Sequence, residues 1–158
     1  MIRTTLPLLA ALSLAAPALA EGHVTGDADA GADAFSQCQT CHVIADDDGN
    51  VLHGKKAKTG PNLFGVFGRQ AGVVDGFRYG KSLVEAGEAG LVWDEEQLVA
   101  YLQDPKDFLR TYLDDKKARS KMSFKVRKEE DALNLTALLG KYATPSEDDA
   151  DGDPAATN

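Results

Sequence analysis

The chain has 158 residues, which is the length of one ordinary domain. It carries 17 Lys and Arg side chains against 25 Asp and Glu, a formal net charge of −8. A protein with this charge balance repels a phosphate backbone, so nucleic-acid binding is excluded as a function.

The first 20 residues have the three parts of a secretory signal peptide. Arg3 supplies the positive charge, residues 6–20 form an uncharged run rich in Leu and Ala, and Ala18-Leu19-Ala20 is a small-residue cleavage site. The run is shorter than the roughly 20 apolar residues that span a bilayer. We therefore expect cleavage after Ala20 and export to the periplasm. Because this removes Arg3 and no acid, the mature chain would carry 16 basic and 25 acidic side chains.

The next predicted element is a helix over residues 28–40. Ala28, Phe35 and Cys38 fall on one face at helical spacing. Gly31 lies on the same face, where the absence of a side chain would let another helix cross closely. The cysteine and histidine motif at residues 38–42 overlaps the end of this helix.

Cys38-Gln39-Thr40-Cys41-His42 has the C-x-x-C-H pattern of covalent haem attachment. The two thiols can each add to a vinyl group of haem, and the imidazole that follows is then placed under the iron as proximal ligand. The chain is exported and has only these two cysteines, so we expect one haem c per chain.

Two other interpretations of the motif stay open. Two cysteines in an exported chain ordinarily suggest a disulfide, and a pair in C-x-x-C spacing would suit a thioredoxin-like protein, although that fold sets the motif in a βαβ unit. A zinc site made by Cys38, Cys41, His42 and His53 is the second alternative. It would use adjacent Cys41 and His42, which departs from the usual paired spacing of zinc ligands.

Met122 is the candidate for the sixth iron ligand. Electron-transfer haems commonly pair His with Met, which raises the reduction potential, and Met122 is the one methionine beyond Met1. A methionine can also simply fill a gap in a core. The polar neighbours Ser120, Lys121 and Ser123 favour a ligand on a loop.

The middle of the chain predicts loops followed by short helices. Residues 46–50 are an acidic turn, residues 51–76 are rich in turn signals, and strand signals are too weak to support a sheet. A short helix is expected over residues 81–86. Asp94 followed by Gln97 resembles a capping box that starts a helix over 95–103.

The last elements complete a helical domain. Pro105 ends the preceding helix, and a further helix is expected over residues 106–113. The final helix, over 128–142, carries an apolar stripe that should pack on the face of Gly31 and Phe35, enclosing the haem between the terminal helices. The stripe consists of Leu135, Leu138, Leu139 and Tyr142. We expect a domain over residues 21–144 and a disordered acidic tail over 145–158.

These motifs, in this order, resemble the soluble class I c-type cytochromes over residues 27–142, and in particular the larger bacterial cytochrome c2 type. The resemblance implies an all-α class I cytochrome c fold, in which the N- and C-terminal helices cross and short helices and loops surround one covalent haem. Besides the haem motif, the segments that carry the resemblance are Thr59-Gly60-Pro61-Asn62-Leu63, Phe67-Gly68-Arg69, Gly76-Phe77-Arg78-Tyr79, Trp93, residues 101–106 and residues 120–124.

The resemblance also implies roles for five residues around the haem. The carbonyl of Pro61 should accept the free ring N–H of His42, which fixes the orientation of the imidazole. Arg69, Tyr79 and Trp93 resemble the donors to a buried haem propionate, and Tyr101 resembles the hydroxyl near the methionine sulfur. Taken without the resemblance, Pro61 is a turn proline, Arg69 a surface charge and Trp93 a core indole.

Two segments depart from the family pattern. Residues 109–119 form a longer, charged insertion ahead of Met122 than the mitochondrial members have. Residues 80–83 lack the asparagine that orders internal water in many members. We therefore do not expect that water network here.

A haem with both axial positions filled has no open site for a substrate, so the sequence predicts a monomeric single-electron carrier and not an enzyme. By resemblance, its transient partners are a cytochrome bc1 complex as donor and a terminal oxidase, photosynthetic reaction centre or periplasmic reductase as acceptor. A haem enzyme or gas sensor, in which Met122 does not bind iron, and a dithiol oxidoreductase are the rival functions.

Residues 105–128 hold nine basic side chains against three acidic ones. This basic segment is expected to surround the exposed haem edge and dock acidic partners, although a charge run is commonly just a solvated surface. The lysines proposed for docking are Lys106, Lys116, Lys117, Lys121 and Lys125.

Overall fold

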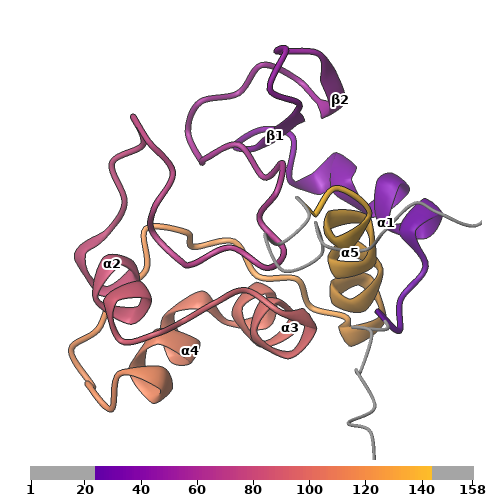
Figure 1. The fold of residues 1–158 in the computed structure, drawn as a ribbon. Coiled ribbons are helices and arrows are strands. Elements are labelled where there is room, and N and C mark those ends of the chain that lie inside the picture. Colours follow the sequence, from indigo (N-terminus) through magenta and orange to yellow (C-terminus); the bar gives the residue numbers. More distant parts are fainter. Residues whose placement is uncertain (1–23, 144–158) are drawn as a thin grey trace, which may run out of the picture.

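A computed structural model describes residues 24–143 of the chain, so the predicted leader at 1–20 and the predicted acidic tail at 145–158 lie outside the described residues. The regular elements of the described chain are mainly helices, joined by long loops (Figure 1). No helix within this range is long and apolar enough to cross a bilayer. The elements are α1 (Ala28–Ala34), a 3₁₀ turn (Phe35–Gln37), β1 (Val43–Ala45), β2 (Val51–Gly54), α2 (Lys81–Glu88), α3 (Glu95–Gln103), α4 (Pro105–Tyr112) and α5 (Glu129–Lys141).

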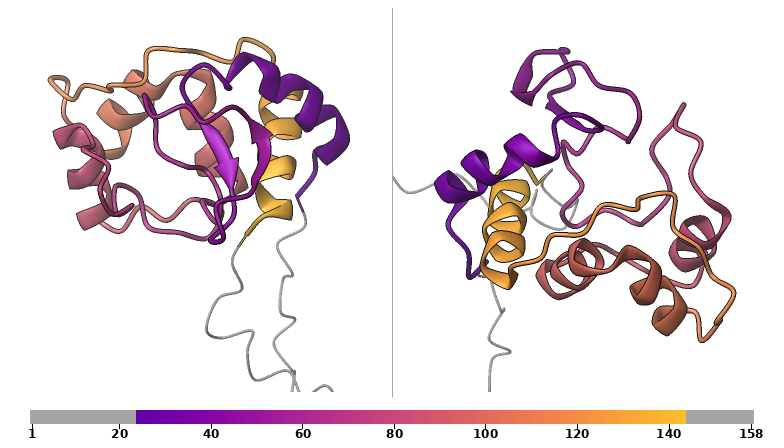
Figure 2. Two further views of the ribbon diagram at one scale, coloured as in Figure 1. Left: turned by 90° about the horizontal axis from the view of Figure 1, so that it is seen from above. Right: turned by 180° about the vertical axis from the view of Figure 1, so that it is seen from behind.

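The first and last helices, α1 and α5, lie side by side in every view (Figures 1 and 2). Gly31 makes this possible, because a Cβ there would lie 2.0 Å from the carbonyl oxygen of Asn134. The Asn134 side chain also accepts the backbone N–H of Asp27 at 2.8 Å. Phe35 and Leu138 are both buried in the same core. The predicted pairing of the terminal helices is confirmed.

The first helix is shorter than its predicted range of 28–40. It ends at Ala34 and tightens into the 3₁₀ turn, as helix C-termini commonly do. Phe35 is buried, whereas Ser36 and Gln37 are exposed, and Cys38 packs partly buried against the same core. The backbone N–H groups of Cys41 and His42 then both donate to the carbonyl of Cys38.

The expectation that the chain contains no sheet was wrong. β1 and β2 form a small antiparallel hairpin with a register shift between Ile44 and Ala45. Its turn was predicted: Asp46 accepts the backbone N–H of Asn50 at 2.8 Å, and Gly49 takes a positive φ of 83° that suits glycine. Two strands of three and four residues with a bulge are too short to show a clear alternation.

Of the middle helices, α3 packs against α5, α4 packs against α3, and α2 packs against α4 on the side away from the terminal pair (Figure 2). The predicted cap of α3 is present, since Asp94 accepts the backbone N–H of Gln97 at 2.7 Å. The bounds of α3 match the predicted 95–103, whereas the bounds of α2, α4 and α5 differ from the predicted ones by one or two residues at some ends. Such shifts are within the usual uncertainty of a helix end.

The charged insertion at 109–119 is ordered by local hydrogen bonds. Its first part continues α4 to Tyr112, and the chain then turns at Asp114, which takes a positive φ of 48°. Asp115 closes the turn by accepting the backbone N–H of Lys117 at 2.8 Å. Ala118 is buried, which anchors the end of the insertion in the core.

Candidate haem-binding site

The two cysteines of the motif are half-buried and not bonded to each other. Burial raises the pKa of the Cys38 thiol to about 11, and the neighbouring Cys41 adds to this effect. Thiol–disulfide oxidoreductases instead lower the pKa of their attacking cysteine. The environment of Cys38 therefore does not suit the dithiol alternative.

The zinc alternative fails on geometry. Within residues 24–143, no three His, Cys, Asp or Glu side chains come together in an arrangement that could hold a metal ion. His53 is engaged elsewhere, because its Nε2 forms a hydrogen bond of 2.9 Å with the hydroxyl of Tyr142. Cys38, Cys41, His42 and His53 thus do not form the four-ligand cluster that a structural zinc site requires.

The imidazole of His42 is held by one ring nitrogen. Nδ1–H donates to the carbonyl oxygen of Pro61 at 3.0 Å, which leaves Nε2 available as a ligand. Burial lowers the pKa of His42, with the Pro61 contact opposing that shift. A neutral imidazole with one nitrogen oriented by a carbonyl is the form that binds a metal.

Gly60 and Asn62 hold Pro61 in place. The backbone N–H of Gly60 donates to the carbonyl of Cys41 at 2.7 Å, and a Cβ on Gly60 would lie 2.3 Å from the imidazole carbon Cε1 of His42. The Asn62 side chain accepts the N–H of Ala45 at 3.1 Å and donates to its carbonyl at 2.6 Å. Only a glycine fits against the ring, so this loop is shaped around the imidazole.

Met122 lies in the segment between α4 and α5. It is half-buried and packs against the main core. Two residues earlier, the hydroxyl of Ser120 shares a hydrogen bond of 3.2 Å with the hydroxyl of Tyr101. The structure therefore links Tyr101 to the methionine segment through Ser120. Burial raises the pKa of Tyr101, which the Ser120 contact opposes.

Arg69, Tyr79 and Trp93 come together on adjoining loops. The backbone N–H of Trp93 donates to the carbonyl of Arg69 at 3.0 Å, and Arg69 and Tyr79 are close enough to influence each other's pKa. Burial lowers the pKa of Arg69, whereas it raises that of Tyr79. The guanidinium donates to the carbonyl of Phe64 at 2.9 Å.

The donor set of these three residues fits a buried carboxylate. Among residues 24–143, no carboxylate forms an ion pair with Arg69. The indole N–H of Trp93 likewise has no acceptor within this range, although the side chain is only 6% exposed. A half-buried guanidinium is costly without an opposite charge nearby. A haem propionate has the charge and the acceptor oxygens that they need.

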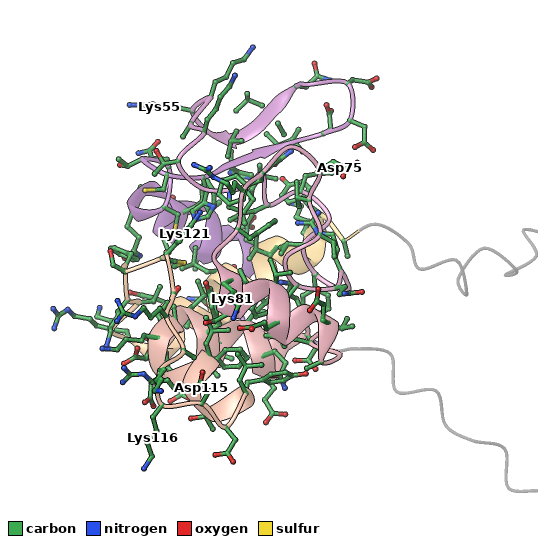
Figure 3. The ribbon with its side chains drawn as sticks, turned by 90° about the vertical axis from the view of Figure 1, so that its left-hand side faces the viewer. Lys55, Asp75, Lys81, Asp115, Lys116 and Lys121 are labelled. Atoms are coloured by element: carbon green, nitrogen blue, oxygen red, sulfur yellow. The ribbon has the colours of Figure 1, made fainter. Side chains whose placement is uncertain are left out.

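The five lysines proposed for docking are all exposed, but they are not equally free. Lys121 Nζ donates to the carbonyl of Arg78 at 2.6 Å, and Lys125 is paired with Asp104. Figure 3 shows Lys116 at the far end of the molecule from Lys55, with Lys81 and Lys121 between them. Lys55 and Lys81 lie outside the basic segment in sequence, and the fold brings them to this side, where Lys81 pairs with Glu85 at 3.0 Å.

Comparison with known proteins finds relatives that match most of the chain. No family model matches the chain. It is 55% identical over 130 residues to cytochrome c2 of Cereibacter sphaeroides, covering 82% of this chain and 88% of that protein. It is 41% identical over 150 residues to cytochrome c-550 of Paracoccus denitrificans, covering 94% and 90%.

The fold of the described chain also matches a solved structure. The crystal structure of cytochrome c2 from Rhodobacter sphaeroides superposes with a TM-score of 0.74 at 55% identity, covering 76% of this chain and 99% of that chain. The fold predicted from the motifs, with its crossing terminal helices, is confirmed by this superposition.

Proposed function

Because the chain belongs to the cytochrome c2 family, in which one haem c is bound covalently, we propose that it is a soluble periplasmic carrier of single electrons and not an enzyme. Cys38 and Cys41 hold the haem. When bound, the haem iron supplies one-electron redox chemistry at an exposed edge. The proposed mature protein begins after Ala20, with its haem domain over residues 21–144 and the acidic tail beyond it.

The observation that carries the proposal is the arrangement around His42. The motif places the imidazole next to both thiols, the carbonyl oxygen of Pro61 accepts a hydrogen bond from Nδ1–H at 3.0 Å, and Gly60 leaves room for the ring. His42 is therefore oriented to present Nε2 to the iron. We assign Met122 as the second axial ligand, which leaves no coordination position for a substrate or for oxygen.

The remaining polar residues balance the charge of the haem region and restrict the backbone near Met122. Arg69, Tyr79 and Trp93 donate to a propionate and so compensate the burial of its charge. Tyr101 holds Ser120 and thereby restricts the backbone ahead of Met122. These contacts favour a rigid site, which suits a carrier because little reorganisation then accompanies electron transfer.

The partners are transient redox proteins with acidic docking surfaces. The five exposed lysines of the basic segment guide the encounter, joined by Lys55 and Lys81 on the side shown in Figure 3. By family resemblance the donor is a cytochrome bc1 complex, and the acceptor is a terminal oxidase, a photosynthetic reaction centre or a periplasmic reductase. The protein acts as a monomer.

Spectroscopy of the ferric protein tests the ligand assignment. The wild type is expected to show the sulfur-to-iron charge-transfer band in the near infrared, and Met122→Ala to lose it because the thioether is gone. Ser123→Ala is the matched control, since Ser123 is exposed and adjacent. A five-coordinate high-spin spectrum in the wild type would contradict the carrier function and favour a haem enzyme or sensor.

Intact mass tests the covalent attachment separately. The exported protein should be heavier than its polypeptide by one haem, and Cys38→Ser with Cys41→Ser should remove that increment. A wild-type mass without haem, with both thiols free to react, would favour the dithiol oxidoreductase instead.

A further inference from the structure

The segment that carries Met122 has no regular structure of its own. Residues 113–128 connect α4 to α5 without helix or strand. Within the described chain, Met122, Ser123 and Phe124 make no hydrogen bond to other residues. The position of the Met122 backbone therefore depends on the anchors on either side of it.

Helices α3 and α4 hold one side of the segment. Arg110 Nε–H donates to the carbonyl of Ala118 at 3.3 Å, Tyr101 bonds to Ser120 at 3.2 Å, and the backbone N–H of Val126 donates to the carbonyl of Leu102 at 2.9 Å. All three anchors come from the same pair of helices. They fix the segment against that wall of the site only.

Residues 76–88 form the opposite wall of the site and hold the segment at two points. The backbone N–H of Arg119 donates to the hydroxyl oxygen of Ser82 at 3.1 Å, and Lys121 Nζ donates to the carbonyl of Arg78 at 2.6 Å. The stem of Lys121 passes over Gly80, where an added Cβ would lie 3.3 Å from Lys121 Cγ. Among residues 24–143, these are the hydrogen bonds that join the segment to residues 76–88.

We propose that Ser82 is a positioning residue for Met122: its hydroxyl fixes the backbone three residues ahead of the ligand and keeps the methionine segment closed over the haem site. The inference rests on the proposed role of Met122 as iron ligand. For the segment that contains Ser82 the sequence predicts a short helix and shows a missing asparagine, but no sequence signal pairs Ser82 with Arg119, 37 residues away.

Of the two anchors, the Ser82 contact is the more restrictive. It joins a short side chain to a backbone amide, so closing it fixes few torsions. The Lys121 contact depends on a long, exposed side chain that loses more rotamer freedom when it is held. Removing the Ser82 hydroxyl leaves the Arg119 N–H without its protein partner whenever the segment is closed, which shifts the equilibrium toward the open form.

Ser82 can be replaced without disturbing α2. The N-cap of this helix is Gly80, and no side chain caps its first turn. Ser82 lies inside the first turn, where alanine has the higher helix propensity. Ser82→Ala therefore removes one hydrogen bond to the methionine segment while the helix that presents residue 82 remains.

Binding of imidazole to the ferric holoprotein measures the opening. Imidazole reaches the iron only when Met122 has left, so its apparent affinity increases in proportion to the open population. We expect Ser82→Ala to bind imidazole about fivefold more tightly, the effect of one net hydrogen bond. Ser82→Thr keeps the hydroxyl and should bind like the wild type, and Ser123→Ala should also leave the affinity unchanged.

The outcomes separate the two proposals. If Ser82→Ala binds imidazole no more tightly than the wild type and keeps the sulfur-to-iron band, the role of Ser82 is overturned, whereas Met122 remains the ligand. Equal gains in Ser82→Ala and Ser82→Thr would also overturn it, because the hydroxyl would then not matter. A wild-type ferric protein without the band would instead contradict the ligand assignment. Thermal unfolding of each variant shows whether any change in affinity follows global stability.

Discussion

At the scale of single residues, Asp104 links two parts of the structure. Its side chain caps α4 by accepting the backbone N–H of Asp107 at 3.1 Å, and it pairs with Lys125 of the methionine segment. Both contacts stabilise the charged form of the side chain over the protonated form. They therefore lower the pKa of Asp104, and Lys125 has a larger effect than the Asp107 amide. One carboxylate thus connects the start of a helix to the segment that carries Met122.

This lowered pKa predicts a pH dependence of stability. A carboxylate whose pKa is lower in the folded state contributes stability that is complete above its unfolded pKa of about 4 and is lost as the pH falls through the folded value. Asp104→Asn should therefore lower the free energy of unfolding at pH 7, and the deficit should shrink below about pH 4.

Urea unfolding of both proteins across this pH range measures the difference. Asp47→Asn, a change of the same kind in the exposed hairpin turn, should track the wild type at every pH. A deficit for Asp104→Asn that stays constant down to the lowest pH would mean that the charge of Asp104 is not involved.

At the scale of elements, the crossing of α1 and α5 depends on Gly31. Helix propensity alone predicts that Gly31→Ala stabilises α1 by about 1 kcal/mol. The crossing predicts the opposite, because the new Cβ would lie 2.0 Å from a backbone carbonyl oxygen of α5 that cannot move by itself. We expect a net loss of about 1–3 kcal/mol in the free energy of unfolding, as for overpacked cores.

Gly140→Ala in α5 is the matched control for this prediction. Its new Cβ would meet only side chains, at 3.3 Å or more, so propensity should dominate and stability should hold or rise. Denaturant unfolding of the two holoprotein variants gives both values. Equal effects of the two substitutions would show that the helix crossing does not require glycine at position 31.

The elements that could be predicted from the sequence are those set by neighbouring residues. The bounds of α3 follow from Asp94 and Pro105, which act locally, and the stripe on α5 follows from the spacing of its leucines. The β-hairpin was missed because two short strands gain their stability from each other. At the site, the spacing of the motif located Cys38, Cys41 and His42. Ser82 was missed because its partner lies far along the chain.

At the scale of the whole molecule, charge is unevenly distributed. The chain is acidic overall, yet its basic segment is positively charged. We predict that electron transfer with a partner that has an acidic docking surface becomes slower as salt is added. Salt screens the attraction between opposite charges that lie farther apart than the Debye length, which is about 8 Å at physiological ionic strength. Lys116→Glu with Lys117→Glu should lower the second-order rate at low salt by roughly tenfold.

Stopped-flow kinetics at several ionic strengths tests this prediction. Lys141→Glu is the control, because it changes an exposed charge at the C-terminal end of α5, outside the basic segment. A rate that does not change with salt, or an equal loss in the control, would mean that the basic segment does not guide docking.

The pairing of α1 with α5 also sets an order of events. The hydrogen bond from Asp27 to Asn134 spans 107 positions, so the domain cannot close until nearly all of it has been made. Cys38 and Cys41 lie far ahead of Asn134 in the chain. When a chain enters a compartment with its N-terminal end first, both thiols are therefore there before the contact that completes the fold can form.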